Sequence, residues 1–434
     1  MNIAYTKHVL DNGLQVLVHE DRNCPIVAVN LWYHVGSKNE RPHHTGFAHL
    51  FEHLMFEGSA HYDRGYFHPL QQAGGVLNGS TNADRTNYWE VVPRHTLELA
   101  LWMESDRMGY LLPALTEAKF ANQRDVVLNE RRQNYENRPY GLASMAVLAA
   151  LYPAAHPYHW STIGEVADLH AATLDQAHDF FRAYYHPANA SLVIAGDVET
   201  AEAFDLAQRY FGDIPPGPPV ARVSATASID REVRLLLEDR VEMPRLYLTW
   251  HSPAMFAAGD AEMDLLSDLL ANGKTSRLYR RLVYERRLAT DVSSLQNSRE
   301  LSGFFQVVAT PTPEHTLAEL DEEISAEIER LMADGPVESE LERSRAQVEA
   351  NFVYRLQTVG GFGGKSDQLN AYNTFLGDAG YFERDLAQYL EATCEDVRRA
   401  GAAHLARGRR VALSVVPQGR TDLAVPGSER TVVS

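Results

Sequence analysis

Three features are scarce or missing in this sequence. Only two cysteines, Cys24 and Cys394, occur in 434 residues, so neither a disulfide framework nor a thiolate metal site is expected. No stretch approaches the roughly 18 consecutive apolar residues that a membrane-spanning helix needs. Basic residues are in the minority, and the net charge of −18 argues against nucleic acid as a partner. An acidic surface could favour basic peptides, although such charge more often serves solubility.

The first residues give an expectation about the cellular compartment. They lack the basic segment and following apolar run of a secretory leader, and a candidate strand begins already at residues 14–19. We therefore expect a cytoplasmic protein without a membrane segment, or a periplasmic one if a leader has been removed.

A proline-rich segment divides the chain almost in half. Residues 213–219 read Asp-Ile-Pro-Pro-Gly-Pro-Pro, which can continue neither a helix nor a central strand. We expect an N-terminal domain over residues 1–213, a linker over 214–228 and a C-terminal domain over 229–434, in keeping with the length of the chain.

The two halves read as one repeated unit. Each has an alternating apolar strand, then an apolar helix that ends at glycine, then long helices and a closing strand; the matching segments are 26–35 and 246–250, 47–57 and 262–272, and 191–198 and 410–416. Strands interleaved with helical blocks predict an α+β fold, with two homologous α/β sandwich domains of mostly antiparallel sheet packed by helices.

The most informative motif lies in the first of these helices. His49-x-x-Glu52-His53 is the inverted form of the zinc-protease signature. On a helix the two histidines share a face and can hold one metal ion, while Glu52 lies beside them as a candidate general base. The alternative is a solvated helix face. Apolar neighbours argue against it, because burying two imidazoles and a carboxylate without a partner is costly; these neighbours are Phe47, Leu50, Phe51, Leu54, Met55 and Phe56.

A third ligand is expected from the helix-forming segment 116–137. Its carboxylates Glu117, Asp125, Glu130 and Glu136 all remain candidates on spacing alone. Glu130 follows three apolar residues and is the best of this ambiguous set.

The chain resembles the pitrilysin-type (inverzincin) metallopeptidases. It is similar to the catalytic subunit of mitochondrial processing peptidase and to bacterial two-component processing-peptidase-like proteins. Members carry the His-x-x-Glu-His motif and, further along the chain, a ligand Glu in a segment like Val-Val-Leu-x-Glu. The separation of His53 and Glu130 along this chain matches the family's spacing, so the resemblance selects Glu130. It implies Zn²⁺ held by His49, His53 and Glu130, with Glu52 as the catalytic base.

The resemblance extends over nearly the whole chain. It implies one half of a clamshell whose substrate-binding edge strand contains Asn78, Thr86 and Tyr88. It also implies a catalytic first half and a non-catalytic second half. An internal alignment agrees, because neither motif histidine recurs in the second half when Gly58 is aligned with Gly273.

The expected activity is zinc-dependent endopeptidase hydrolysis of peptides or unfolded segments. Zinc with two histidines and one glutamate keeps an open position for water, and Glu52 would take the proton of that water. Two alternatives stay open. One is a non-catalytic scaffold subunit with a decayed motif, and the other is a protease dedicated to one precursor peptide.

The chain departs from the family's pattern in two places. Gln123 stands where many members have a second Glu. Members with a complete second domain also carry an Arg and a Tyr that hold the substrate near zinc, and the matching positions here are Tyr284 and Thr290. We therefore expect a heterodimer in which a homologous partner supplies this pair, with a homodimer as the second choice.

A glycine-rich stretch, Gly360–Gly364, is the other unusual segment. It could be the flexible substrate loop that partners of processing peptidases carry. A mobile connection between helices is the favoured interpretation.

Overall fold

The computed structural model describes residues 2–433, and contacts divide the chain into two compact units. The first unit consists of Met1–Asn129, Ser161–Val223 and Asn351–Arg384, and the second of Glu130–Trp160, Ser224–Ala350 and Asp385–Ser434. These units differ from the domains expected at 1–213 and 229–434, because each unit takes one segment from the other half of the chain.

A six-stranded sheet forms the centre of the first unit. All neighbouring strands are antiparallel except β2 and β6, which are parallel. The central strand β6 is buried along its whole length, whereas β4 lies at an edge. In spatial order the strands are β1 (Thr6–Val9), β2 (Gln15–Glu20), β6 (Ala190–Gly196), β3 (Ile26–Tyr33), β5 (Thr86–Pro93) and β4 (Val76–Thr81).

The second unit repeats this arrangement. It is again a six-stranded sheet, in which β11 is the central strand that closes the repeat and pairs in parallel with β7. In spatial order the strands are β12 (Glu429–Arg430), β7 (Val233–Asp239), β11 (Val411–Pro417), β8 (Arg245–Ser252), β10 (Gly303–Pro311) and β9 (Ala289–Asn297). The predicted repeat and the predicted α+β fold class are confirmed.

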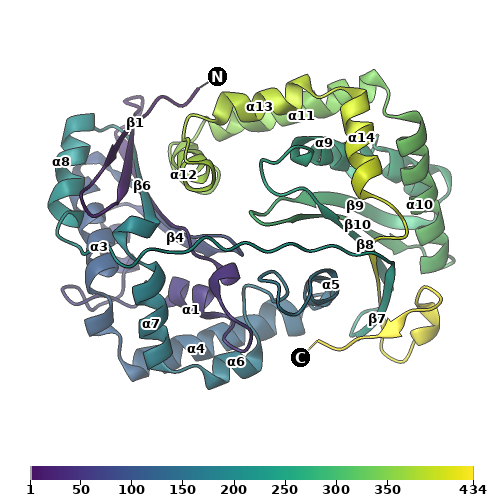
Figure 1. Ribbon diagram of the computed structural model, residues 1–434, viewed down its shortest axis with the longest axis horizontal. Helices are drawn as coiled ribbons and strands as arrows, with labels where there is room; N and C mark the ends of the chain where they lie inside the picture. Colours follow the sequence, from purple (N-terminus) through teal and green to yellow (C-terminus); the bar gives the residue numbers. More distant parts are fainter. Residues whose placement is uncertain (1, 434) are drawn as a thin grey trace. The chain divides into compact units, whose positions relative to one another are not determined.

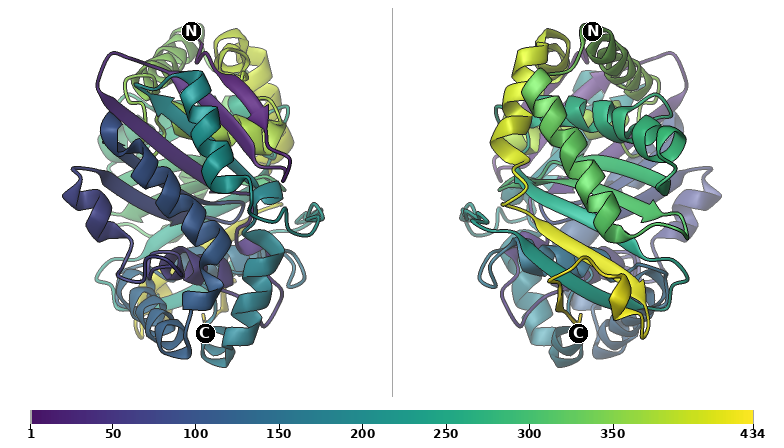
Figure 2. Two further views of the ribbon diagram at one scale, coloured as in Figure 1. Left: turned by 90° about the vertical axis from the view of Figure 1, so that its left-hand side faces the viewer. Right: turned by 90° about the vertical axis from the view of Figure 1, so that its right-hand side faces the viewer.

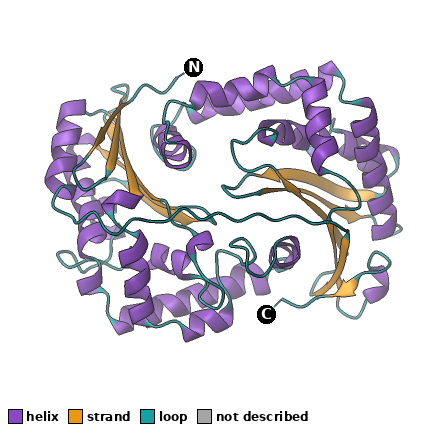
Figure 3. Cartoon of the chain, in the orientation of Figure 1, coloured by secondary structure: helices purple, strands orange, loops and turns teal. Residues whose placement is uncertain are grey.

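Helices cover the sheet of each unit on both faces (Figures 1 and 3). In the first unit α3 and α8 lie across one face, and in the second α10 and α14 do so (Figure 2, left and right). The helices grouped mainly with the first unit are α1 (Phe47–Leu54), α2 (Phe67–Gln72), α3 (Leu97–Tyr110), α4 (Glu117–Arg131), α6 (Val166–Ala171), α7 (Leu174–Tyr184), α8 (Thr200–Phe211) and α12 (Lys365–Leu376). Those grouped mainly with the second are α5 (Ala143–Leu151), α9 (Asp260–Ala271), α10 (Leu317–Asp334), α11 (Glu338–Arg355), α13 (Phe382–Glu391) and α14 (Cys394–His404).

The exchanged segments supply the helix on the second face of each sheet. Helix α12 packs on β3 and β6 of the first unit, and α5 packs on β7, β8 and β11 of the second. The α12 contact is polar. Asp367 accepts hydrogen bonds from Asn30 (3.2 Å) and Trp32 (3.1 Å) of β3, and Asn373 donates to Ser191 of β6 (2.8 Å). A sheet face that buries such groups needs matching partners, which explains why α12 belongs to this unit.

The connection between α8 and β7 contains no helix or strand, in agreement with the proline-rich linker expected there. Among residues 2–433, no helix combines the length and apolar character required to cross a bilayer.

The glycine-rich segment Gly360–Gly364 joins α11 to α12, as expected for an interhelical connection. Its backbone is tied to α12, since the Gly363 amide donates to Asp367 (2.8 Å). Gly360 lies against the sheet: a Cβ there would come within 2.5 Å of Val91 and 2.6 Å of Ala28.

We expect Gly360→Ala to lower the free energy of unfolding by about 1–3 kcal/mol, because the added methyl group overpacks the contact with β3 and β5. Denaturant unfolding measures this change. The control is Gly408→Ala, where a Cβ would meet nothing within 4 Å. Equal stability of the two variants would contradict the packing argument.

Candidate active site

Helix α1 carries three of the four residues expected as zinc ligands or catalytic base, and its N-terminus is fixed from two sides. The buried carboxylate of Glu40 accepts hydrogen bonds from the amides of Gly46 (3.0 Å) and Ala48 (2.9 Å). Asp168 accepts a bond from the Thr45 hydroxyl (2.7 Å). A negative charge at this end also complements the helix dipole.

A close glycine–glycine contact adds to this constraint. Gly46 is in the left-handed region with φ +90°, and Gly164 packs against it so closely that a Cβ on Gly164 would lie 2.5 Å from the Cα of Gly46. Both positions therefore require glycine.

The apolar side of α1 determines which way its polar side points. Phe47, Leu50, Phe51 and Leu54 are buried, and the Phe51 ring packs on that of Tyr185 with centroids 5.2 Å apart. Because these residues occupy most of the circumference, the two histidines and the glutamate of the motif share the remaining strip. The two imidazole rings lie edge to face, with centroids 4.9 Å apart.

The third member of the cluster comes from α4. One candidate ligand atom each from His49, His53 and Glu130 lies within 4.8 Å of the others, the one such group of at least three found within residues 2–433. The unit division falls between Asn129 and Glu130, inside this continuous helix. Two imidazoles and one carboxylate form a donor set that zinc prefers. Zinc ligands lie about 2 Å from the ion, and the three donors lie close enough to one another to share one ion.

The other carboxylates considered from the sequence are placed elsewhere. Glu117 is exposed at the start of α4, and the Asp125 side chain is 67% exposed beside Arg124. Glu136 forms an ion pair with Arg131 (3.1 Å) in the π-helical turn that follows α4.

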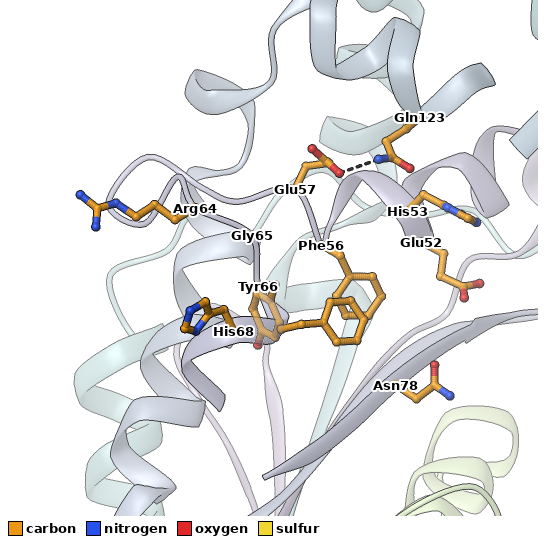
Figure 4. A pocket seen from close by; sticks show the side chains of 11 residues that line it. Glu52, His53, Phe56, Glu57, Arg64, Gly65, Tyr66, His68, Asn78 and Gln123 are labelled. Atoms are coloured by element: carbon orange, nitrogen blue, oxygen red, sulfur yellow. Dashed lines mark hydrogen bonds between the residues drawn. The ribbon is translucent and has the colours of Figure 1, made fainter. Parts of the chain in front are cut away.

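Glu52 and His53 line a cavity of about 540 Å³ within the first unit (Figure 4). Asn78 on the edge strand β4 lines the same cavity, and the Glu52 carboxylate points toward that strand. The structure thus brings together Glu52, one of the two histidines and one of the three expected substrate-binding residues.

The assignment of Thr86 and Tyr88 to substrate binding is corrected. Both are fully buried on β5, which is an inner strand. The Thr86 hydroxyl donates to the Val35 carbonyl (2.9 Å), and the Tyr88 hydroxyl donates to the Phe51 carbonyl (3.2 Å). Their side chains support the end of β3 and α1 and do not face a substrate.

The floor of the cavity was not predicted. It consists of the rings of Phe56, Tyr66 and Phe67, with the Phe56 and Phe67 centroids 4.6 Å apart. Beneath them the buried guanidinium of Arg107 lies 3.9 Å from the Tyr66 ring centroid and forms an ion pair with Glu104. Such aromatic patches carry no spacing signal, so no pattern in the sequence predicts them.

Only a few side chains carry the buried charge beneath this aromatic floor. Tyr66 donates a hydrogen bond to Glu90 (2.9 Å). Burial raises the pKa of Glu90 well above its usual range, and the neighbouring Glu104 raises it further. The neighbouring Arg107 guanidinium and the Tyr66 hydrogen bond act in the opposite direction on this pKa.

Two further polar residues lie near the site, although neither was among the expected site residues. Gln123, the departure from the family pattern, lines the cavity and donates to Glu57 (Figure 4). Arg85 lies over the Trp32 ring at 5.0 Å and donates to the Ser80 carbonyl (2.8 Å). Burial lowers the pKa of Arg85, while the charges of nearby carboxylates, Glu52 among them, act in the opposite direction.

The second unit lacks the motif histidines in the corresponding helix. Helix α9 begins after Gly259, which is left-handed like Gly46, and its sequence contains no histidine. Tyr284 is 51% exposed in the π-helical turn Tyr279–Glu285. Thr290 lies on β9 and donates to the Thr310 carbonyl (3.3 Å). Neither position can supply the Arg and Tyr of the family's site.

Comparison with known proteins agrees with this geometry. Residues 15–158 match the family described as insulinase (peptidase family M16), and residues 171–348 match the peptidase M16 inactive domain. The chain belongs to the peptidase M16 family. The zinc protease PqqE of Helicobacter pylori is 29% identical over 396 residues, which are 90% of this chain and 88% of that protein.

Solved structures place the M16 chain in the same fold. The crystal structure of a protease from Helicobacter pylori has a TM-score of 0.88 at 28% identity and covers 96% of this chain and 100% of its own. A peptidase M16 inactive domain from Pseudomonas fluorescens has a TM-score of 0.84 at 21% identity, covers 95% of this chain and 98% of its own, and supports the fold alone.

Loss of a residue that hydrogen-bonds a metal ligand typically lowers metal affinity by roughly 10- to 100-fold. We expect Glu130→Gln to lower zinc affinity by more than this, because Glu130 is itself a proposed ligand and an amide is a poor one. Metal content after dialysis against a zinc buffer measures this. The matched control is Glu117→Gln, the same substitution at an exposed position of the same helix, and we expect it to keep one zinc per chain. Full zinc retention by Glu130→Gln would remove Glu130 from the ligand set.

Proposed function

We propose that this M16 chain is a zinc metalloendopeptidase that hydrolyses peptides or unfolded segments. The observation that carries the proposal is the grouping of His49, His53 and Glu130 within 4.8 Å beside the cavity that Glu52 lines. A scaffold subunit would not need this donor set. The zinc proteases among its relatives support the same assignment.

Each residue has a defined part in the proposed chemistry. Zinc held by His49, His53 and Glu130 would act as a Lewis acid toward the scissile carbonyl and the attacking water. Glu52 takes a proton from that water and passes it to the leaving amine. The Glu52 side chain is partly buried, which strengthens its electrostatic interactions with the reacting groups.

The edge strand β4 offers a place for the substrate backbone. Within residues 2–433 it pairs with β5 alone, and Val76 and Asn78 along it are exposed. An extended peptide added there would pair through main-chain groups, with little demand on its side chains. This leaves Asn78 as the proposed substrate contact among the three residues expected from the sequence.

We expect Glu52→Gln to keep one zinc per chain and to lower kcat by about 10²–10⁴-fold, the usual contribution of a general base. A quenched fluorescent peptide measures turnover, and metal analysis measures zinc. Asp125→Asn, an exposed carboxylate change on α4, is the control and retains full turnover. Turnover by Glu52→Gln at the wild-type rate would overturn the assignment.

We further propose that the chain is the catalytic subunit of a two-subunit peptidase. The support is the occupancy of the expected Arg and Tyr positions by Tyr284 and Thr290. An oxyanion donor is typically worth about 10²–10³-fold in rate, so a chain without one hydrolyses peptides slowly.

We expect the purified chain to cleave peptides slowly and a homologous partner that carries the Arg and Tyr to raise kcat by about 10²–10³-fold. Activity is measured for each protein alone and for the mixture, with light scattering to give the mass of the complex. High activity of the single chain as a monomer would refute the requirement for a partner, and high activity as a dimer would favour the homodimer.

A further inference from the structure

A second cavity, of about 520 Å³, lies in the second unit shortly after the proposed ligand Glu130. Residues 134–141, which join α4 to α5, form one wall, and β8 forms the other through Arg245 and Tyr247. Its lining is mostly polar and includes guanidinium and phenol groups. The residues are Asn134, Tyr135, Arg138, Pro139, Tyr140, Gly141, Ser144, Arg245 and Tyr247.

We propose that this cavity binds a carboxylate group of the peptide substrate. The carboxylate comes from an Asp or Glu side chain or from the C-terminus of the peptide. This inference rests on the proposed peptidase function.

The two arginines of the cavity are not neutralised by carboxylates. Within residues 2–433, neither Arg138 nor Arg245 forms an ion pair with Asp or Glu. Arg245 donates from its Nε to the Thr310 hydroxyl (3.0 Å) and also hydrogen-bonds the Tyr247 hydroxyl, so it adds positive charge to the cavity, while the exposed guanidinium of Arg138 offers its N–H groups to a ligand. A guanidinium fork matches the two oxygens of a carboxylate, which favours this ligand class over a neutral one.

Among the described residues no Asp or Glu lines the cavity, and two acidic side chains in adjoining segments bind other groups. Asp239 accepts hydrogen bonds from the amides of Tyr140 (2.7 Å) and Arg240 (2.6 Å). Glu136 is paired with Arg131. In a chain of net charge −18, a cavity lined by two arginines and, within residues 2–433, by no Asp or Glu is a local exception that favours an anion.

The cavity is also held in one shape. Tyr140 has φ +61°, its hydroxyl donates to the Met243 carbonyl (2.9 Å), and the Arg245 guanidinium lies 3.7 Å from its ring centroid. A Cβ on Gly141 would lie 2.1 Å from the Tyr135 carbonyl, so only glycine allows this turn. A preformed site binds its ligand with little ordering cost.

Asn134 connects this cavity to the metal cluster. It lines the cavity, and its side-chain amide donates to the Glu130 carboxylate (3.2 Å). Burial raises the pKa of Tyr135, and the charge of Glu130 contributes to the same shift. A peptide with a carboxylate in the cavity would therefore have its chain beside a residue proposed to hold the metal, so the site would select among substrates.

The test measures peptide binding by zinc-loaded Glu52→Gln protein, using fluorescence anisotropy. The probes are short fluorescein-labelled neutral peptides in which a single Glu replaces Gln at each position in turn, each with a free or an amidated C-terminus. We expect one Glu position, or the free C-terminus, to tighten binding by about tenfold, in line with a charge-assisted hydrogen bond. High salt should weaken this preference.

The matched variants are Arg138→Gln and Arg409→Gln. Both arginines are exposed and belong to the second unit, but only Arg138 lines the cavity. We expect Arg138→Gln to abolish the tenfold preference while binding of the neutral peptide is unchanged, and Arg409→Gln to have no effect. Arg245→Gln should act like Arg138→Gln, with circular dichroism to verify its fold.

The outcomes separate this inference from the proposed function. If the wild-type enzyme cleaves neutral and acidic peptides equally and no carboxylate tightens binding, the peptidase stands and the carboxylate site is wrong. If the preference exists but Arg138→Gln retains it, the carboxylate binds elsewhere and the assignment to this cavity is overturned. If acidic peptides bind through Arg138 but none is cleaved with any partner, the site stands and the peptidase function fails.

Discussion

The position of helix α1 depends on one buried carboxylate. Glu40 accepts the amides of Gly46 and Ala48 and so determines the residue at which the helix begins. A helix that started one residue later would rotate by about 100° and turn its polar strip into the apolar core. The close contact of Gly46 with Gly164 removes the remaining freedom. Both imidazoles and Glu52 thus owe their direction to groups that take no part in the chemistry.

The two cavities differ in where their charged side chains lie. The first has an aromatic floor, and the charges of Arg107 and Glu104 lie paired beneath it, away from the space that a ligand would fill. The second includes guanidinium groups in its own lining and holds that of Arg245 against a phenol ring. Apolar contact and directed charge are therefore supplied by different parts of the chain.

The repeat, the fold class and the motif residues on α1 were predicted from the sequence, because periodicity and a short motif are local signals. Glu130 came from the resemblance, since spacing alone left four carboxylates open. Thr86 and Tyr88 were assigned wrongly because an extended segment does not show whether its strand lies inside a sheet or at its edge. The exchange of α5 and α12 and the cavity around Arg245 depend on contacts between residues far apart in sequence, which no local pattern contains.

The exchange of segments has a consequence for synthesis on the ribosome. The first sheet cannot receive α12 until Leu376 has been made, long after β6, the last strand of that sheet, ends at Gly196. At the usual rate of elongation this interval is on the order of ten seconds. During that time the polar groups of Asn30 and Ser191 have water in place of their α12 partners. Water can satisfy these polar groups until α12 is made. The uncovered sheet face is therefore less prone to aggregate than an apolar face would be.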